Sequence, residues 1–197
     1  MEIDERLKRQ LEFIVEADKM KNIYRQTYVI HEDRKENDAE HSFHISLMVP
    51  LLAEYSNTEI NQLKTMKMLL IHDFVEIDAG DTYCYGDTTD EDKRAREEKA
   101  ADRLFNILPA DMAEEYRALW NEFEAHLTPE AKFAASMDRL QPILLQVAKG
   151  GKSWKEHKVK YKQVAKRIAP VADGSEVLWN YLDKLLDASV KKGILEK

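Results

Sequence analysis

The short stretch IHDFVE, residues 71–76, places one histidine and two carboxylates within five positions. It lies in a run whose apolar spacing predicts a helix over residues 59–77, and Asp73 falls on the apolar side of that helix. A bare carboxylate that points into an apolar core is strongly unfavourable. A metal ion would neutralise Asp73 and make its inward position tolerable. His72 and Asp73 are therefore candidate metal ligands, with Glu76 close to the same point.

Two further metal ligands are expected from other helices. His41 is in register with the apolar residues of a helix predicted over residues 40–56, so it should face inward. Asp138 borders the apolar face of a helix predicted over residues 129–149. Pro142 lacks the N–H that would bond the carbonyl of residue 138, so the helix should be loosened beside Asp138, although prolines also occur inside helices for packing alone.

Two histidines and two aspartates form a mixed nitrogen and oxygen donor set. This set suits Mn, Co, Fe, Ni, Zn or Mg, so the expected cofactor is a divalent metal ion of undetermined identity. Four protein ligands leave coordination positions for water and a substrate oxygen, and such an ion favours hydrolysis because it lowers the pKa of water and polarises a phosphoryl oxygen. A polar cluster that is satisfied without a metal is the alternative.

The elements that must position these side chains are all predicted to be helices. Six Gly and five Pro among 197 residues are few for an all-β chain, and 44% of the residues are apolar. An acidic loop is expected over 78–93. Further helices are predicted over 3–19, 94–108, 111–126 and 174–192. The expected fold is a single all-α domain, residues 1–197, with a metal-binding core over about 25–150 and a C-terminal helical extension over about 151–197.

Charge and cysteine content restrict the class of protein. The formal net charge of −7 argues against general nucleic-acid binding. Cys84 is the only cysteine, so no intramolecular disulfide can form. The charged N-terminus MEIDERLKRQLEF is unlike a secretory signal, and no apolar run reaches the roughly 18 residues that a membrane span needs. These features predict a cytoplasmic protein that binds a small molecule and neither nucleic acid nor membrane.

Four motifs, in this order, resemble those of the HD-domain metal-dependent phosphohydrolases: EHS at 40–42, HDFVE at 72–76, GD at 80–81 and MDRLQP at 137–142. The chain looks most like the 5′-deoxynucleotidase branch of that family. Segments throughout the chain carry this likeness: RKENDAEHS, REEKAA, LWNEFEAHLTPEAKF and GGKSWKEH. The resemblance implies a helical HD-domain bundle whose metal site lies between core helices.

The resemblance also implies a role for each candidate residue: His41, His72, Asp73 and Asp138 as metal ligands, Glu76 as the acid/base or water-orienting residue, Asp81 near the sugar or the attacking water, and Arg25 as the clamp on the substrate phosphate. A guanidinium suits a phosphate because its fork bonds two oxygens at once. For three of these residues, a purely structural role is the alternative. Glu76 could brace His72, Asp81 could cap a turn, and Arg25 could form a structural salt bridge.

The implied activity is removal of phosphate from (deoxy)nucleoside 5′-monophosphates by metal-activated water. Hydrolysis of nucleoside triphosphates or alarmone-like diphosphates is an alternative, as is a non-catalytic nucleotide-binding metal protein. In deoxynucleotidases a tryptophan commonly follows the phosphate-binding arginine, whereas Gln26 follows Arg25 here, so the preference for deoxyribose is open. The family likeness suggests a homodimer, formed through the apolar faces of helices 3–19 and 174–192.

Two charged segments have more than one interpretation. Residues 149–167 carry eight Lys or Arg, which would form either a solvated face or a basic rim that attracts anionic substrate. The acidic stretch 87–92 would be a surface loop or a lid.

Overall fold

The computed structural model describes residues 4–81, 84–85 and 90–197 of the chain. Its elements, in chain order, are α1 (Glu5–Ala17), η1 (Asp18–Asn22), β1 (Tyr24–Tyr28), β2 (Lys35–Asn37), α2 (Asp38–Leu52), η2 (Ala53–Tyr55), α3 (Gln62–Ile71), α4 (Glu76–Ala79), α5 (Asp90–Phe105), α6 (Ala110–Ala125), α7 (Pro129–Ala148), α8 (Lys152–Glu156), α9 (Tyr161–Ile168), α10 (Val171–Gly174) and α11 (Glu176–Lys191). The predicted all-α fold is confirmed. Among the described helices, none is both long and apolar enough to cross a membrane.

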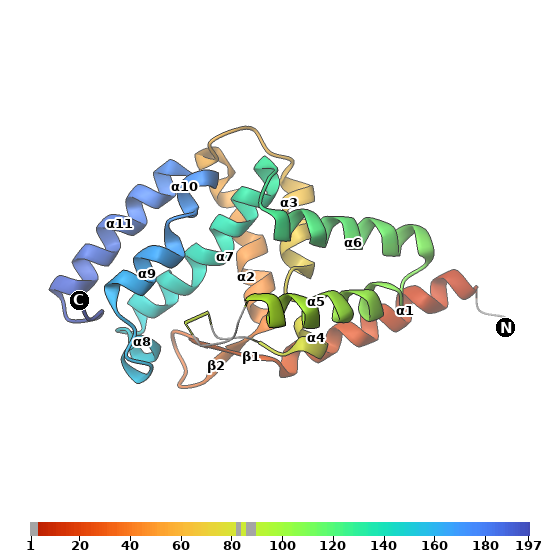
Figure 1. Ribbon diagram of the computed structural model, residues 1–197, viewed down its shortest axis with the longest axis horizontal. Helices are drawn as coiled ribbons and strands as arrows, with labels where there is room; N and C mark the ends of the chain where they lie inside the picture. The colour runs from red at the N-terminus through yellow and green to blue at the C-terminus, as the bar shows by residue number, and fades with distance from the viewer. Residues whose placement is uncertain (1–3, 82–83, 86–89) are drawn as a thin grey trace.

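Helix α7 lies at the centre of the bundle. It packs against α2, α3, α6 and α10. Ile45 of α2, Leu69 of α3 and Met137 of α7 are completely buried between these helices. Figure 1 shows α1, α5 and α6 at one end of the molecule and α8, α9 and α11 at the other, with α7 between them. The expected helix over 129–149 is confirmed, since α7 spans Pro129–Ala148 and continues through Pro142. Thr128 caps its start by accepting a hydrogen bond from the amide of Ala131.

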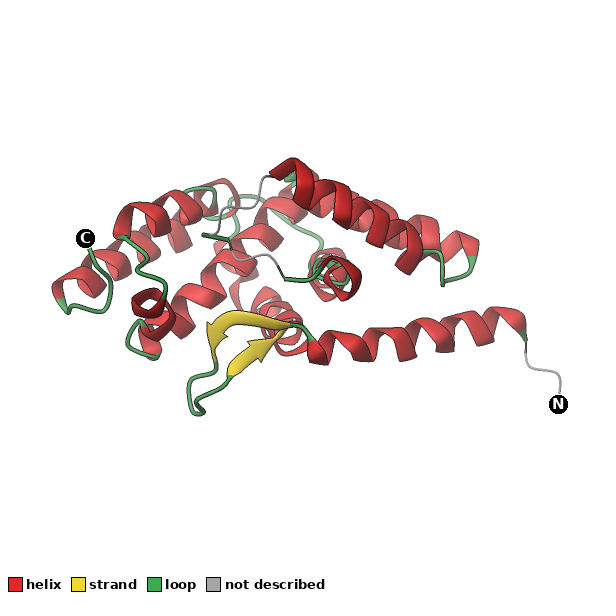
Figure 2. Ribbon diagram, turned by 60° about the horizontal axis from the view of Figure 1, so that its bottom comes forward, coloured by secondary structure: helices red, strands yellow, loops and turns green. Residues whose placement is uncertain are grey.

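A short two-stranded hairpin, which was not predicted, precedes α2. Strands β1 and β2 pair antiparallel (Figure 2). Tyr24 lies opposite Asn37 and Tyr28 opposite Lys35. Asn37, the last residue of β2, is also the N-cap of α2. Its side chain accepts from the amide of Glu40 while the Glu40 carboxylate accepts from the Asn37 amide. This capping box fixes where α2 begins and therefore where His41 lies.

The predicted single helix over 59–77 is wrong. Helix α3 ends at Ile71, and residues 72–75 form a turn before the short helix α4. The carbonyl of His72 accepts a hydrogen bond from the indole Nε1 of Trp120 at 3.2 Å, whereas in a continuous helix it would accept from the amide of Glu76. That amide instead bonds to the carbonyl of Asp73 at 2.9 Å. A side chain from α6 thus holds the HDFVE motif in a turn.

Three short helices, α8, α9 and α10, lie between α7 and α11, where the expected helical extension had defined bounds only for its last helix, 174–192. The chain enters α8 through Gly151, whose φ is +71°. A Cβ at this position would lie 2.1 Å from the carbonyl oxygen of Ile194, so a glycine is required there. Helix α5 begins at Asp90, before the predicted start at residue 94. Residues 86–89, which include part of the acidic stretch interpreted as a loop or a lid, lie outside the described residues.

Candidate metal centre

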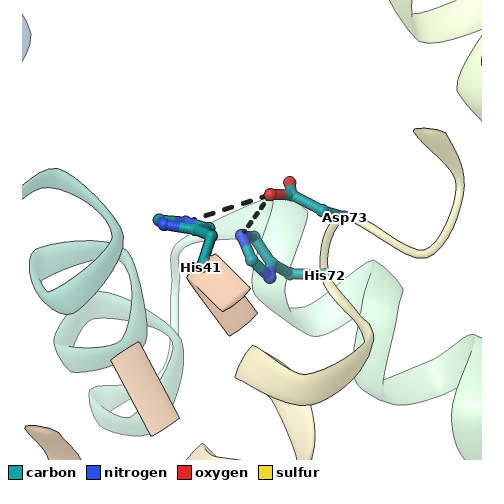
Figure 3. Close-up of side chains that lie close together, drawn as sticks. All are labelled: His41, His72 and Asp73. Atoms are coloured by element: carbon teal, nitrogen blue, oxygen red, sulfur yellow. Dashed lines mark ion pairs between the residues drawn. The ribbon is translucent and has the colours of Figure 1, made fainter. Parts of the chain in front are cut away.

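The structure brings the four predicted metal ligands together from three places in the chain: α2, the turn after α3, and α7. The Nε2 atom of His72 lies 3.0 Å from Asp73 Oδ2 and 3.8 Å from Asp138 Oδ1. The Nε2 atom of His41 lies 3.2 Å from Asp138 Oδ1 and 3.9 Å from Asp73 Oδ2. Figure 3 shows both imidazole rings directed towards the Asp73 carboxylate.

Hydrogen bonds on the far side of each ring leave Nε2 facing this cluster. The Nδ1 atom of His72 lies 2.9 Å from the carbonyl oxygen of Leu69, and the Nδ1 atom of His41 lies 3.1 Å from Oε1 of Gln141. Both partners are acceptors, so the rings carry a proton on Nδ1 and direct Nε2 into the cluster. An outward N–H of this kind is usual for a metal-binding histidine. Although Asp73 Oδ2 lies 3.0 Å away, the buried Nε2 of His72 forms no hydrogen bond of good geometry among the described residues.

These distances suit one ion bound by all four residues. Bonds of about 2.0–2.2 Å to nitrogen and oxygen place neighbouring donors roughly 3–3.6 Å apart. The four donor atoms are separated by 3.0–3.9 Å along the contacts given above. Two imidazole nitrogens and two carboxylates that face one another are poorly satisfied unless a cation or a proton lies between them. The residues therefore fit a divalent ion.

The charges at the centre affect one another strongly. Burial opposes ionisation of Asp73 and Asp138, but other interactions outweigh it and lower the pKa of both carboxylates. These are chiefly the electrostatic effects of His72 and Arg25 on Asp73, and a hydrogen bond to His41 together with the charge of Arg167 on Asp138. Burial and the charge of Arg25 lower the pKa of His41, but hydrogen bonds to Asp138 and Glu36 outweigh them, and that pKa is raised to about 9. Without a metal, a proton on His41 stabilises the cluster.

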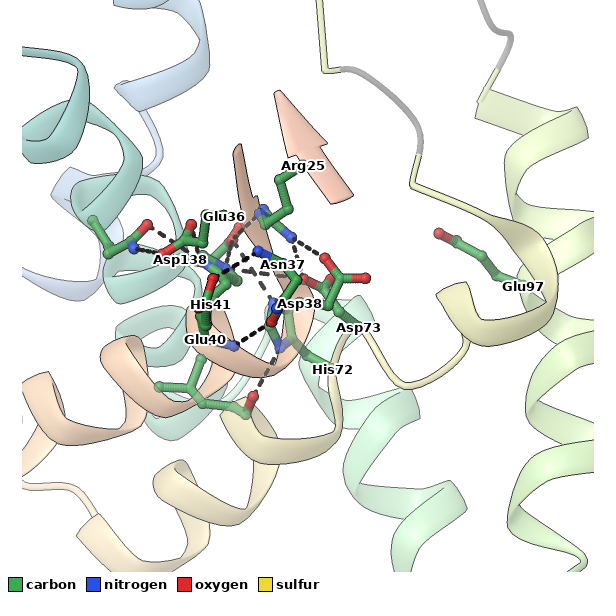
Figure 4. Close-up of polar contacts among 12 residues, drawn as sticks. Arg25, Glu36, Asn37, Asp38, Glu40, His41, His72, Asp73, Glu97 and Asp138 are labelled. Atoms are coloured by element: carbon green, nitrogen blue, oxygen red, sulfur yellow. Dashed lines mark hydrogen bonds and ion pairs between the residues drawn. The ribbon is translucent and has the colours of Figure 1, made fainter. Parts of the chain in front are cut away.

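Arg25 projects from β1 into the same centre (Figure 4). Its Nη1 bonds to Asp73 Oδ2 and lies 3.3 Å from Asp38 Oδ1, and its Nη2 lies 3.9 Å from Asp138 Oδ1. The guanidinium thus forms the salt bridges that one alternative expected, and it does so with two of the candidate metal ligands.

Glu76 and Asp38 form an acidic pair at the edge of the cluster. Together with Asp73 they place one carboxylate oxygen each within 4.8 Å of one another. Burial, followed by the charge of Asp73, raises the pKa of both groups, to about 7 for Asp38 and well above its usual range for Glu76. Asp38 was not among the residues predicted to form the site. Its position three residues before His41, on the same face of α2, was the available signal.

A cavity of about 350 Å³ opens beside the metal ligands. Arg25, Glu76 and Asp81 all line it, so the three residues assigned catalytic or phosphate-binding roles lie around one space. Burial raises the pKa of Asp81, against the opposing effect of Arg25. Gln26 also lines the cavity, as does Arg167 on α9, whose Nη2 lies 3.4 Å from Asp138 Oδ2. One member of the basic segment 149–167 therefore faces the site.

A buried polar pair supports His41 from behind, and it too was missed. Gln141 donates to Oε1 of Glu36 at 2.6 Å while its own Oε1 faces His41. Glu36 and Gln141 are 2% and 0% exposed. A histidine ligand held by a carboxylate and an amide is fixed in ring orientation and tautomer. His44, by contrast, is exposed, and its Nδ1 lies 3.2 Å from Nε2 of Gln141.

Comparison with solved structures supports this assignment of the fold. A crystal structure of a protein described as a predicted metal-dependent phosphohydrolase, from Magnetospirillum magnetotacticum MS-1, is 47% identical and superposes with a TM-score of 0.93. That match covers 98% of this chain and 100% of the other. An HD-domain phosphohydrolase from Listeria innocua, 19% identical, shares the fold with a TM-score of 0.64, over 94% of this chain and 92% of its own.

Comparison of sequences points in the same direction. The human 5′-deoxynucleotidase HDDC2 is 27% identical over 135 residues, and its counterpart from Dictyostelium discoideum is 29% identical over 140 residues. Each match covers 68% of this chain, together with 65% of the human protein, which is less than two thirds of its length, and 74% of the Dictyostelium protein. A profile of the HD domain family matches residues 17–179, most of the sequence, and the chain therefore belongs to the HD domain family.

Proposed function

We propose that the protein is a metal-dependent phosphohydrolase that removes phosphate from (deoxy)nucleoside 5′-monophosphates. The observation that carries the proposal is the group of His41, His72 and Asp73, with Asp138 in contact with both histidines, beside a cavity into which Arg25 also projects. The relatives named 5′-deoxynucleotidase and the structural neighbour described as a metal-dependent phosphohydrolase support the same reaction class.

His41, His72, Asp73 and Asp138 would hold the divalent ion, which we take to be Mn, Co, Mg, Fe, Ni or Zn. When bound, such an ion lowers the pKa of water and polarises a phosphoryl oxygen. Its charge also offsets the repulsion between Asp73 and the acidic pair Asp38–Glu76.

The chain's own groups surround the place where a phosphate ester would react. Arg25 is only 14% exposed and points into the cavity, where its guanidinium can bond two phosphate oxygens. Burial and the charge of Asp73 raise the pKa of Glu76, which favours its protonated form, and a protonated Glu76 would donate to the oxygen of the departing alcohol. Asp81, at the wall of the cavity, would orient the attacking water or the sugar.

Two alternatives keep the same site. The substrate could be a nucleoside triphosphate or an alarmone-like diphosphate, in which case pyrophosphate would be released. The protein could instead bind nucleotides around its metal without turning them over. A panel of mono-, di- and triphosphates, assayed for phosphate and for pyrophosphate after reconstitution with each candidate metal, separates these outcomes.

The Asp73→Ala variant tests the proposal directly. Loss of one of four ligands should remove metal binding and lower turnover by more than about 100-fold, a larger effect than the loss of a residue that only supports a ligand. Metal content by elemental analysis and phosphate release from deoxynucleoside monophosphates are the measurements. Asp183→Ala, at an exposed position on α11, is the matched control and should change neither. Full activity of Asp73→Ala would refute the proposal.

We also infer that the protein is cytoplasmic, as its single cysteine suggested, and that it is a homodimer, as the family likeness suggested. Helix α1 supports this inference because it exposes Leu11, Ile14 and Val15 at 49%, 64% and 72%. Exposed apolar residues that recur along one helix commonly mark an interface. Helix α11 exposes fewer, namely Val177 and Tyr181 at 56% and 52%.

A further inference from the structure

The cavity is a long space that follows one face of α7. Asp138, Arg139, Pro142, Ile143 and Gln146 all line it, at spacings that keep them on one side of the helix. At a rise of 1.5 Å per residue, the wall from Asp138 to Gln146 is about 12 Å long. The metal ligand Asp138 marks one end of this wall and Gln146 marks the other.

The two ends of the wall differ in charge. At the Asp138 end, Arg25 and Arg167 lie within 3.9 Å of that carboxylate and Arg139 adjoins it in the chain. At the Gln146 end, the lining residues contributed by α8 are Ser153 and Trp154, which are uncharged. One end therefore suits a phosphate, and the other suits an uncharged group that can form hydrogen bonds.

Two polar side chains at the uncharged end lack partners in the chain. Gln146 is 6% exposed, and its amide forms none of the hydrogen bonds found among the described residues. Ser153 is 1% exposed, and its buried Oγ has no partner within the same part of the chain. Buried polar groups are nearly always hydrogen-bonded in folded proteins. Both side chains line the cavity, so a molecule in the cavity can provide the missing partners.

Helix α8 holds this end of the cavity in place. The close approach of Gly151 to Ile194 fixes the start of the helix. The hydroxyl of Tyr28 on β1 bonds to Glu156 at 3.1 Å, and the ammonium of Lys152 lies 4.2 Å from the centre of the Tyr28 ring. Trp154 is 2% exposed and contributes apolar surface beside Ser153. The polar groups of this end are thus presented from a fixed element rather than from a loop.

We propose that Gln146 and Ser153, beside the apolar surface of Trp154, bind the nucleobase of the substrate. This inference rests on the proposed function, which places the phosphate at the Asp138 end. The sugar then extends along Pro142 and Ile143, and the base reaches Gln146. A nucleobase is flat, uncharged and edged with hydrogen-bond donors and acceptors. The amide and the hydroxyl each offer both a donor and an acceptor to such an edge.

The test compares two substrates in one variant. Gln146→Met keeps the length of the side chain and removes its hydrogen bonds. Deoxynucleoside 5′-monophosphates carry a base, whereas 2-deoxyribose 5-phosphate carries the same sugar and phosphate without one. We expect KM for the nucleotides to rise about 10-fold, while kcat and the turnover of 2-deoxyribose 5-phosphate change by less than about twofold. Gln62→Met, at the exposed start of α3, is the matched control and should behave as wild type.

Several outcomes are decisive. A rise in KM that is equal for both substrates, or absent for both, overturns the nucleobase assignment while leaving the phosphohydrolase proposal intact. If wild-type protein hydrolyses neither ester, the proposed function fails, and calorimetric binding still tests the base site. Wild type should then bind a nucleoside monophosphate more tightly than 2-deoxyribose 5-phosphate, and Gln146→Met should lose that difference. If circular dichroism shows that Gln146→Met is not folded, the same two substrates are compared in Ser153→Ala.

Discussion

Glu76 lies where it could either donate a proton or brace the metal ligands. Its carboxyl is buried against Asp73 and Asp38, and one of its oxygens has no partner among the described residues. Glu76→Gln keeps the size of the side chain and removes the acid. If Glu76 is the proton donor, kcat should fall by about 100- to 10,000-fold while metal content stays at the wild-type level. Glu114→Gln, at an exposed position on α6, is the matched control.

Reduced metal content with turnover lowered only in proportion would refute the catalytic role of Glu76. A brace that orients His72 acts through the ion, so its loss should weaken metal binding by about 10- to 100-fold and lower turnover only in proportion. Restoration of Glu76→Gln turnover by excess metal would therefore favour the bracing role.

His41 provides a prediction about pH, because its pKa rises from 6.5 to about 9 in the folded, metal-free protein. A raised pKa means that the folded state holds the proton more tightly than the unfolded chain. The resulting stability is complete below pH 6.5 and is lost as the pH rises to about 9. The pKa of Asp38 is raised from 3.8 to about 7, so protonated Asp38 also stabilises the fold, and this stability is lost as the pH rises from about 4 to 7.

Thermal unfolding with and without metal measures this effect. Metal-free protein should lose several degrees in Tm between pH 6.5 and 9, since one kcal/mol corresponds to about 2–4 °C in a chain of this size. Metal-loaded protein should show a smaller loss, because a histidine that binds a metal through Nε2 no longer carries the second proton. A metal-free Tm that is constant or rises over this range would contradict the coupling between His41 and Asp138.

At the scale of elements, Trp120 determines the shape of the HDFVE motif. Trp120→Phe keeps the ring and removes the indole donor that bonds the carbonyl of His72. The buried carbonyl would then lack its partner, at a cost of about 1–3 kcal/mol in unfolding free energy. We expect weaker metal binding as well, because His72 and Asp73 lie in the turn that this bond stabilises. Chemical denaturation and metal titration measure the two effects.

Trp179→Phe on α11 is the control for this substitution, because Trp179 lies outside the turn. Equal effects of the two substitutions would show that loss of indole packing, and not the bond to His72, is responsible.

The sequence predicted which helices carry the ligands better than it predicted their ends. Apolar periodicity placed His41 and Asp138 on inward faces of α2 and α7, and both side chains are buried there. The same periodicity continued α3 through His72, because a spacing rule cannot include a hydrogen bond from Trp120, 48 residues away. The hairpin that carries Arg25 was missed for a similar reason, since β1 and β2 are short and are stabilised mainly by each other and by the neighbouring elements.

Long-range contacts also explain which parts of the site were missed. Glu36 and Gln141 support His41 from positions 105 residues apart, and neither belongs to a spacing pattern that sequence alone could detect. The family likeness named Arg25 and Asp81, and the structure places both around the cavity without testing their roles. The division of the domain near residue 150 also stays a prediction.

At the scale of the whole molecule, the proposed dimer can be tested on α1. Leu11 and Val15 line a groove on α1, and the exposed Lys8 and Glu12 lie beside them. Two copies of α1 packed antiparallel across a two-fold axis would place opposite charges face to face around an apolar centre. Leu11→Glu/Val15→Glu should therefore yield monomers, measured as a halved mass in light scattering.

Val177→Glu/Tyr181→Glu on α11 is the matched double substitution. It should leave the dimer intact if α1 forms the interface. This arrangement would be refuted if the wild-type protein is monomeric. It would also be refuted if the α1 variant stays dimeric while the α11 variant becomes monomeric.

The separation of the ligands along the chain has a consequence for biosynthesis. His41 and Asp138 are 97 residues apart, so the fourth ligand leaves the ribosome on the order of 5–20 s after the first. A nascent chain can present His41, His72 and Asp73 during that interval, but it cannot complete the site. The ion would therefore be captured when α7 packs between α2 and α6, and the metals that the cell holds available at that moment would influence which one the finished protein contains.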